Sequence, residues 1–115
     1  MSVNRWFIVA GMTAACRMVV EECFKWSNQR KVFGKPLLEQ PVIRNKLAKM
    51  VSELEGLQSW MEITTYNMNK MSYKESAIKL AGPIALLKLL STRTSHNISD
   101  EACQIFGGTS FSSFN

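Results

Sequence analysis

Two short stretches of the sequence carry side chains that could hold a ligand with a phosphate and an aromatic base. In QRKVFGKPLLEQP, the guanidinium of Arg30 can bind two phosphate oxygens at once, and the nearby Phe33 offers a ring that can contact a base. In QIFGG, Gln104 carries an amide one turn before Gly107 and Gly108, which have no Cβ to keep a ligand from the backbone. Helix termination explains the same glycines, so the residues alone leave both interpretations open.

A long first helix is predicted upstream of the first stretch. It runs from Asn4 to Phe33 and ends at Gly34, because glycine is common just beyond a helix C-terminus. One face has residues at spacings of three and four, namely Phe7, Ala10, Ala14, Arg17, Val20, Phe24 and Ser27. The first half of this segment is apolar on all sides, which predicts burial against more than one neighbour.

A second helix is predicted to begin near Leu38 or Pro41 and to end near Asn69. Its apolar positions alternate spacings of three and four: Leu47, Met50, Leu54, Leu57, Met61, Thr64 and Met68. This seven-residue rhythm is typical of helices that pack at a shallow angle in a bundle.

The third helix is predicted to start with a capping box, in which Ser72 and Glu75 exchange hydrogen bonds. A kink is expected at Pro83, which removes one backbone hydrogen bond, and the helix is expected to stop at Gly107 and Gly108. Its predicted apolar stripe is Ile78, Ala81, Ala85, Leu89 and Thr92.

These elements predict an all-α fold, an up-down bundle of three long helices with an irregular tail. We expect residues 1–108 to form the bundle and residues 109–115 to form the tail. No strand-like alternation or hairpin signal is seen. In such a bundle the first connection and the end of the third helix lie at the same end. The two candidate stretches would therefore meet there.

The charge pattern argues against several classes of partner. The chain carries a net charge of +5, which permits attraction to phosphates or acidic lipids. The basic residues are spread along the chain, however, so a nucleic-acid surface is not expected. No segment reaches the roughly 18 apolar residues of a membrane-spanning helix, so no membrane span is predicted.

The three cysteines, Cys16, Cys23 and Cys103, and the single His96 do not form a common metal or disulfide pattern. Cys16 and Cys23 lie two helical turns apart, roughly 10 Å, which is too far for a disulfide. A zinc site would lack ligands. We therefore expect no metal, buried reduced thiols and an intracellular chain, without distinguishing cytoplasm, peroxisome and mitochondrion.

Three motifs, RKVFGKPL, LAKM and ACQIFGG, together resemble the C-terminal helical domain of acyl-CoA dehydrogenases over nearly the whole chain. The resemblance implies a four-helix-bundle type that lacks its last helices. It also implies FAD as cofactor. Contacts from Arg30, Phe33, Gln104, Gly107 and Gly108 would reach the pyrophosphate and adenine end of the FAD of a neighbouring subunit.

Departures from the family pattern bear on activity. Many members have Thr where Val32 stands and Gln where Pro41 stands. The family's catalytic glutamate, in a loop after the Gly-Gly motif, has no counterpart before Asn115, and the alternative position is Asn4. Arg5 matches an arginine near the substrate. The resemblance thus implies no catalytic residue here, no acyl-CoA oxidation by the isolated chain, and acyl-CoA binding only in a full-length context.

Three functional hypotheses follow. The first is the FAD-contacting, oligomerising C-terminal domain of an acyl-CoA dehydrogenase, inactive alone, which pairs with itself or with a second subunit of that kind. The second is a helical scaffold or protein-interaction module that has lost flavin binding. The third is a basic helical binder of nucleic acid or acidic surfaces. Acyl-chain length and electron acceptor are not fixed by the sequence.

Overall fold

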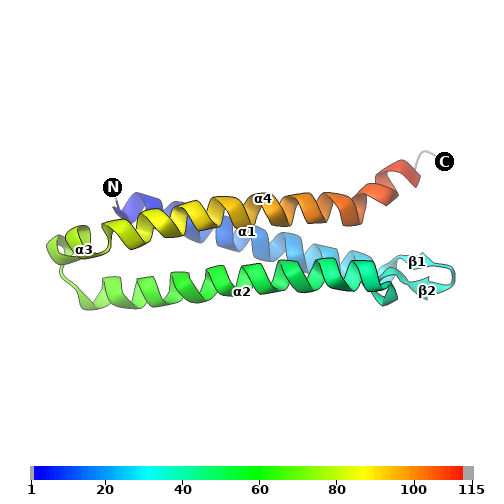
Figure 1. Cartoon of the computed structure of the whole chain (residues 1–115), viewed down its shortest axis with the longest axis horizontal. Coiled ribbons are helices and arrows are strands. Elements are labelled where there is room, and N and C mark those ends of the chain that lie inside the picture. The colour runs from blue at the N-terminus through cyan, green and yellow to red at the C-terminus, as the bar shows by residue number, and fades with distance from the viewer. Residues whose placement is uncertain (1, 113–115) are drawn as a thin grey trace.

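The computed structural model describes the backbone of residues 2–112 and the side chains of residues 4–107. The elements are α1 (Ser2–Gln29), β1 (Lys31–Val32), β2 (Lys35–Pro36), the 3₁₀ turn η1 (Leu37–Glu39), α2 (Pro41–Lys70), α3 (Tyr73–Lys79) and α4 (Ala81–Ser112). Three long helices lie side by side, with α3 at one end and the β1–β2 hairpin at the other (Figure 1). The predicted all-α bundle is confirmed, in an elongated body of 59 × 23 × 16 Å.

Helix α1 buries a different face from the predicted one. Its fully buried positions recur at spacings of four and three: Val9, Thr13, Cys16, Val20, Cys23 and Ser27. Of the predicted stripe only Val20 and Ser27 belong to this set, and Phe7 is 63% exposed. The prediction failed because the first half of α1 is apolar on every side, so spacing alone permits more than one stripe.

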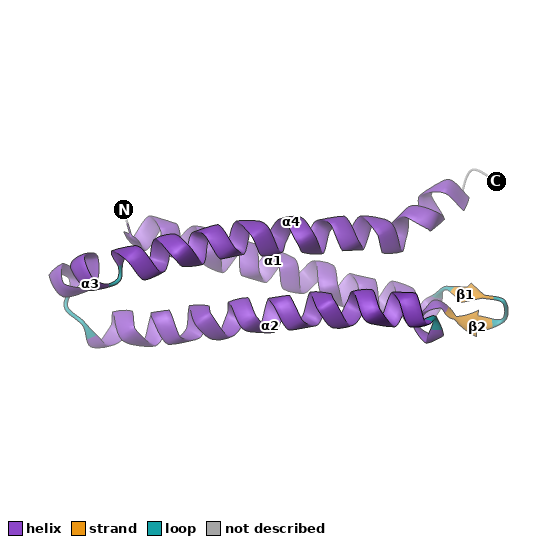
Figure 2. Cartoon of the chain, in the orientation of Figure 1, coloured by secondary structure: helices purple, strands orange, loops and turns teal. Residues whose placement is uncertain are grey.

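The connection after α1 is a β-hairpin, which the sequence reasoning missed. Helix α1 ends at Gln29, and Val32 pairs with Lys35 across a two-residue turn (Figure 2). The two turn residues have positive φ, 55° at Phe33 and 79° at Gly34, as a type I′ turn requires. Gly34 therefore serves the hairpin turn and does not cap α1.

Helix α2 follows its prediction closely. Pro41 occupies the first position, and the helix ends at Lys70. Five of the seven predicted core positions are buried: Leu47, Met50, Leu54, Leu57 and Thr64. The remaining two methionines are partly buried. This agreement arises because the other positions between Leu47 and Leu57 are charged or small, apart from Val51, which leaves one clear stripe.

The expected kink in the third helix is a break between α3 and α4. The Ser72 hydroxyl accepts a hydrogen bond from the Glu75 backbone N–H at 3.2 Å, which confirms half of the capping box. The Glu75 carboxylate instead accepts from Lys79 at 2.8 Å, and this hydrogen bond lowers the pKa of Glu75. Pro83 lies in the first turn of α4, where its missing N–H breaks no helical hydrogen bond.

The break also shifts the buried face of α4. The buried positions of α4 are Ile84, Leu87, Ser91, Thr94, Ile98, Ala102 and Ile105, and Leu80, between α3 and α4, is buried next to them. The predicted stripe was wrong, since Ile78 is 81% and Leu89 is 58% exposed. The predicted stripe assumed one continuous helix from Ile78 to Thr92, whereas the break between α3 and α4 changes which residues of α4 face the core. Helix α4 also continues to Ser112 and does not stop at Gly107 and Gly108, so residues 109–112 of the predicted tail are helical.

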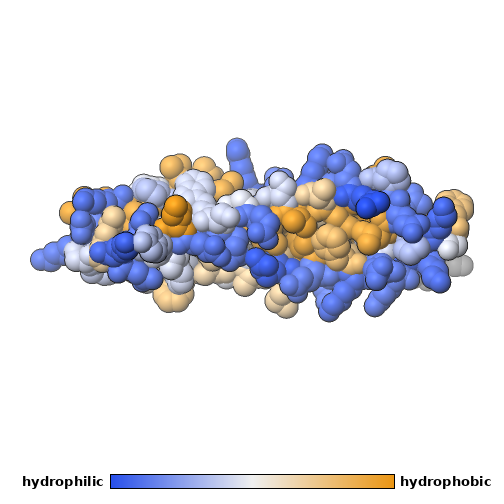
Figure 3. All heavy atoms as spheres, turned by 90° about the horizontal axis from the view of Figure 1, so that it is seen from below, coloured by the Kyte–Doolittle hydropathy of each residue, from blue (hydrophilic) through white to orange (hydrophobic). Residues whose placement is uncertain are grey.

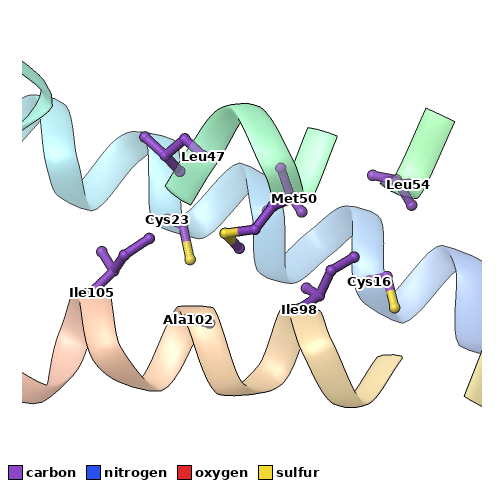
Figure 4. Packing of buried hydrophobic residues seen from close by; sticks show 9 residues of the cluster. Cys16, Cys23, Leu47, Met50, Leu54, Ile98, Ala102 and Ile105 are labelled. Atoms are coloured by element: carbon purple, nitrogen blue, oxygen red, sulfur yellow. The ribbon is translucent and has the colours of Figure 1, made fainter. Parts of the chain in front are cut away.

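All three long helices contribute to the core. The larger cluster, nearer the hairpin, comprises Cys16, Val20, Cys23, Leu47, Met50, Leu54, Ile98, Ala102 and Ile105 (Figure 4). A smaller cluster joins Val9, Leu57 and Leu87. The larger cluster therefore holds α1, which leads into the hairpin, against the last turns of α4.

Within the described part of the chain, no helix is long and apolar enough to cross a membrane.

Candidate functional site

The hairpin fixes the backbone of Arg30 between α1 and η1. The Arg30 N–H donates to the carbonyl of Trp26 at 2.9 Å, and the Arg30 carbonyl accepts from the N–H of Leu37 at 2.7 Å. Two further cations, Lys31 and Lys35, lie exposed on the paired strands. Sequence reasoning did not assign these lysines to the site, although they flank Phe33 in the motif. The hairpin thus concentrates positive charge at one end of the bundle.

Phe33 occupies the tip of the hairpin in an unfavourable conformation. Its φ of 55° lies in the left-handed region, which costs a residue with a Cβ about 1–2 kcal/mol. The side chain is 94% exposed, so burial within the chain compensates for little of this strain. Strained backbone conformations of this kind cluster at binding sites and ligand clamps.

Gln104 lies in α4 and takes part in a polar network with α2. Its Oε1 accepts a hydrogen bond from Lys46 Nζ, and the same ammonium forms an ion pair with Glu101 at 3.0 Å. Its Nε2 donates to Asp100 over a long 3.4 Å. The carbonyl side of the amide is therefore engaged, and the second N–H of Nε2 can serve a ligand. Lys46 was missed because its partner lies far away in the sequence.

Gly107 lies inside α4, so its backbone N–H is not released by a helix end as the sequence suggested. It is partly buried and lines a groove of about 460 Å³ together with Val19, Ser99, Ala102, Cys103 and Phe106. A Cβ added at Gly107 would meet nothing within 4 Å. Packing within the described chain therefore does not require a glycine here. Gly108 is in α4, and its surroundings lie outside the described residues.

The structure brings five of the predicted residues to one end of the molecule and leaves Arg5 at the other. The hairpin with Arg30 and Phe33 projects at the end where α4 finishes (Figure 1). Arg5 lies at the opposite end of α1, about 35 Å along the helix axis from Gln29, where the hairpin begins. There it lines a groove of about 340 Å³ together with Ala85, Lys88, Leu89 and Thr92.

Buried polar atoms also lie at the hairpin end. The indole Nε1 of Trp26 and the hydroxyl of Ser27 are buried without a hydrogen-bond partner among the described residues. The Trp26 ring packs against Phe106, with centroids 5.6 Å apart. Away from this end His96 is exposed, and the described residues contain no cluster of three potential metal ligands. The chemistry available is therefore that of cations, amides and aromatic rings.

Comparison with known proteins identifies the family. The family model "Acyl-CoA dehydrogenase, C-terminal domain" matches residues 1–115. The chain belongs to the acyl-CoA dehydrogenase family. Among curated relatives it is 31% identical over 108 residues to acyl-CoA dehydrogenase apdG of Emericella nidulans, covering 94% of this chain and 25% of the relative. It is 30% identical to the 3-(aryl)acrylate reductase of Clostridium sporogenes, covering 94% and 27%.

Solved structures agree on the fold of this family member. A "probable acyl CoA dehydrogenase" from Mycobacterium abscessus superimposes with a TM-score of 0.81 at 21% identity, covering 94% of this chain and 27% of that one. A second crystal structure, from Mycobacterium smegmatis, gives a TM-score of 0.84 at 18% identity, with the same coverage of 94% and 27%. The chain thus spans about a quarter of the length of these proteins.

Proposed function

We propose that this chain is the FAD-contacting C-terminal domain of an acyl-CoA dehydrogenase, and that its hairpin end holds the pyrophosphate and adenine half of the cofactor. The observation that carries the proposal is Phe33, which is strained and almost fully exposed at the tip of a cationic hairpin. An aromatic ring held in this way can contact an adenine, while the adjacent guanidinium of Arg30 binds phosphate.

The donor groups at the hairpin end fit a pyrophosphate. Arg30, Lys31 and Lys35 supply positive charge, and the segment from Arg30 to Leu38 contains no acidic residue. The amide of Gln104 adds an N–H donor, because its carbonyl is already engaged by Lys46. The space beside Gly107 is open, so a ligand can come close to the α4 backbone there. These groups suit the AMP portion of FAD, whereas the flavin ring would have to be held by other parts of the protein.

The same reasoning leads us to propose that the isolated chain does not oxidise acyl-CoA. Bound FAD supplies the hydride acceptor in this family's chemistry, and a base must remove the substrate proton. The groove beside Arg5 is lined by Ala85, Lys88, Leu89 and Thr92, with no carboxylate among its described lining residues. Asn4, next to Arg5, has no basic side chain. The described residues that line this groove therefore offer no carboxylate base.

Oligomerisation is the second part of the proposal. The hairpin tip points away from the bundle, so a cofactor gripped there would rest mainly on another body, either a second copy or a related subunit (Figure 1). Viewed from the α2 side, apolar side chains gather in the half nearer the hairpin and are bordered by hydrophilic ones (Figure 3). Large side chains on α1 and α4 are also exposed, including Phe7, Met18, Leu86 and Leu89. Such surfaces support contact with a protein partner.

Replacement of the cation tests the phosphate assignment. FAD is titrated into the purified chain, and quenching of tryptophan fluorescence is followed. We expect Arg30→Ala to weaken binding at least tenfold, which corresponds to about 1.4 kcal/mol. Arg93→Ala, which removes the same charge from an exposed position in the middle of α4, should leave the affinity unchanged. Equal affinities for the two variants would show that the phosphate grip is misassigned. A parent chain that binds no FAD would favour the scaffold hypothesis.

A further inference from the structure

The contacts between α1 and α4 define a regular register. The two helices run in the same direction, from the α3 end toward the hairpin end (Figure 1). The Ser91 hydroxyl donates to Met12 Sδ at 3.4 Å, and Cys16 Sγ lies 3.3 Å from Ser95 Oγ, each pair being 79 positions apart. The ring pair of Trp26 and Phe106 has nearly the same separation. This register places Cys23 level with Ala102 and Cys103.

The two thiols at this level differ in accessibility. Cys23 is 0% exposed and packs in the same core cluster as Ala102, and its sulfur points toward α4 (Figure 4). Cys103 is exposed and lines the groove of about 460 Å³ that also contains Ala102. The sequence-based expectation that all thiols are buried is therefore wrong for Cys103. A small oxidant can reach one thiol from solvent while the other remains enclosed behind it.

Helix geometry allows a covalent link at this level. A disulfide needs Cα atoms about 4.4–6.8 Å apart. Helix axes that pack 8–10 Å apart, with Cα atoms about 2.3 Å from each axis, bring facing Cα atoms, here those of Cys23 and Ala102, within about 3–5 Å. Cys103 is the next residue along α4, and it lines a groove that α1 shares through Val19. The seam is lined here by small side chains such as Cys16, Ser95 and Ala102. Burial is the main cause that raises the pKa of Cys23 to about 11, and electrostatic interactions with Cys103 and Glu22 add to it.

We infer that Cys103 and Cys23 form a redox-active thiol pair, in which a peroxide oxidises Cys103 and Cys23 then closes an intramolecular disulfide between α1 and α4. In the first step the Cys103 sulfur attacks hydrogen peroxide, the O–O bond breaks, and a sulfenic acid and water are formed. In the second step the Cys23 sulfur displaces the hydroxyl group as water and the S–S bond forms. Two thiols lose two electrons and two protons, and the peroxide becomes two waters.

The third cysteine is excluded from this pair by its position. Cys16 is buried two helical turns from Cys23, and its sulfur already contacts Ser95. The proposed disulfide would join the last turns of α4, which carry Gln104, to α1. This inference does not depend on FAD binding, because it concerns only the chain's own thiols.

The test uses the purified full chain, first fully reduced and then treated with one equivalent of hydrogen peroxide at neutral pH. We expect intact mass to fall by two hydrogens and non-reducing peptide mapping to recover a Cys23–Cys103 linked peptide. The matched control Cys16→Ser should form the same link. Cys103→Ser should abolish it, and Cys23→Ser should leave a sulfenic acid at Cys103 that a dimedone probe labels.

Two results would overturn the inference. One is a sulfenic acid at Cys103 that persists in the parent chain without any linked peptide, which would mean that Cys23 cannot reach it. The other is a disulfide between two chains through Cys103. Because Cys103 is exposed, Cys103→Ser should fold normally, and its far-ultraviolet circular dichroism confirms this before oxidation.

Discussion

Replacement of Phe33 by asparagine tests the strain at the hairpin tip. Asn-Gly is the preferred pair for a type I′ turn, and asparagine tolerates the φ of 55° that Phe33 adopts. The left-handed conformation costs phenylalanine about 1–2 kcal/mol. Since the ring is 94% exposed, its removal forfeits little burial within the chain. Phe33→Asn should therefore stabilise the fold by about 1 kcal/mol and at the same time weaken FAD binding.

The stability effect is measured by urea unfolding, which reports the free energy of unfolding directly. Tyr73→Asn is the matched control, because Tyr73 is also an exposed aromatic, 73% accessible, but lies in a helix. That variant should change stability by no more than about 0.5 kcal/mol. If Phe33→Asn were less stable than the parent, the ring would be making stabilising contacts in the free chain. The strained backbone of Phe33 would then serve the stability of the free chain and not the binding of a ligand.

Three further predictions concern the network, the core and pH. Lys46→Met should weaken FAD binding several-fold, because it removes the hydrogen bond that holds the Gln104 amide. Lys49→Met, which breaks no hydrogen bond among the described ones, should leave the affinity unchanged. Fluorescence titration with FAD measures both variants. Leu87→Ala should lower the free energy of unfolding in urea by about 2–5 kcal/mol, because Leu87 is buried. Leu89→Ala should lower it by less than about 0.5 kcal/mol, because Leu89 is 58% exposed. A larger loss for Leu89→Ala than for Leu87→Ala would refute the assignment of the buried face of α4. Burial chiefly raises the pKa of Cys23 from 9.0 to about 11, so the unfolded chain loses its proton first. The free energy of unfolding should therefore fall as the pH rises from 9 to 11, by at most about 1.4 kcal/mol per pH unit. Melting curves recorded across this pH range measure the fall, and an equally steep fall in Cys23→Ala would contradict the prediction.

The sequence predicts helix faces only where polar residues leave a single choice. The stripe of α2 from Leu47 to Leu57 was predictable because the remaining positions there are charged or small, apart from Val51. In α1 the apolar first half allows several stripes, and tertiary packing selects the one through Val9 and Cys16. In α4 the break before Ala81 resets the register, so a pattern carried over from Ile78 points to the wrong face.

The candidate site was predictable in its location and not in its details. Helix order alone places Arg30 and Gln104 at the same end of the bundle. The hairpin was missed because its strands have two residues each, and because its turn has Phe33 where asparagine is usual. The bond from Lys46 to Gln104 joins residues 58 positions apart, and no local pattern signals such a pair.

We propose that this chain binds the pyrophosphate and adenine half of FAD. A titration of the purified chain with FAD and, in parallel, with FMN, which has the same flavin ring and lacks the adenosine phosphate, tests this proposal. We predict saturable quenching of tryptophan fluorescence by FAD, displacement of FAD by ADP, and at least tenfold weaker binding of FMN. Equal binding of FAD and FMN, or no displacement by ADP, would contradict the account.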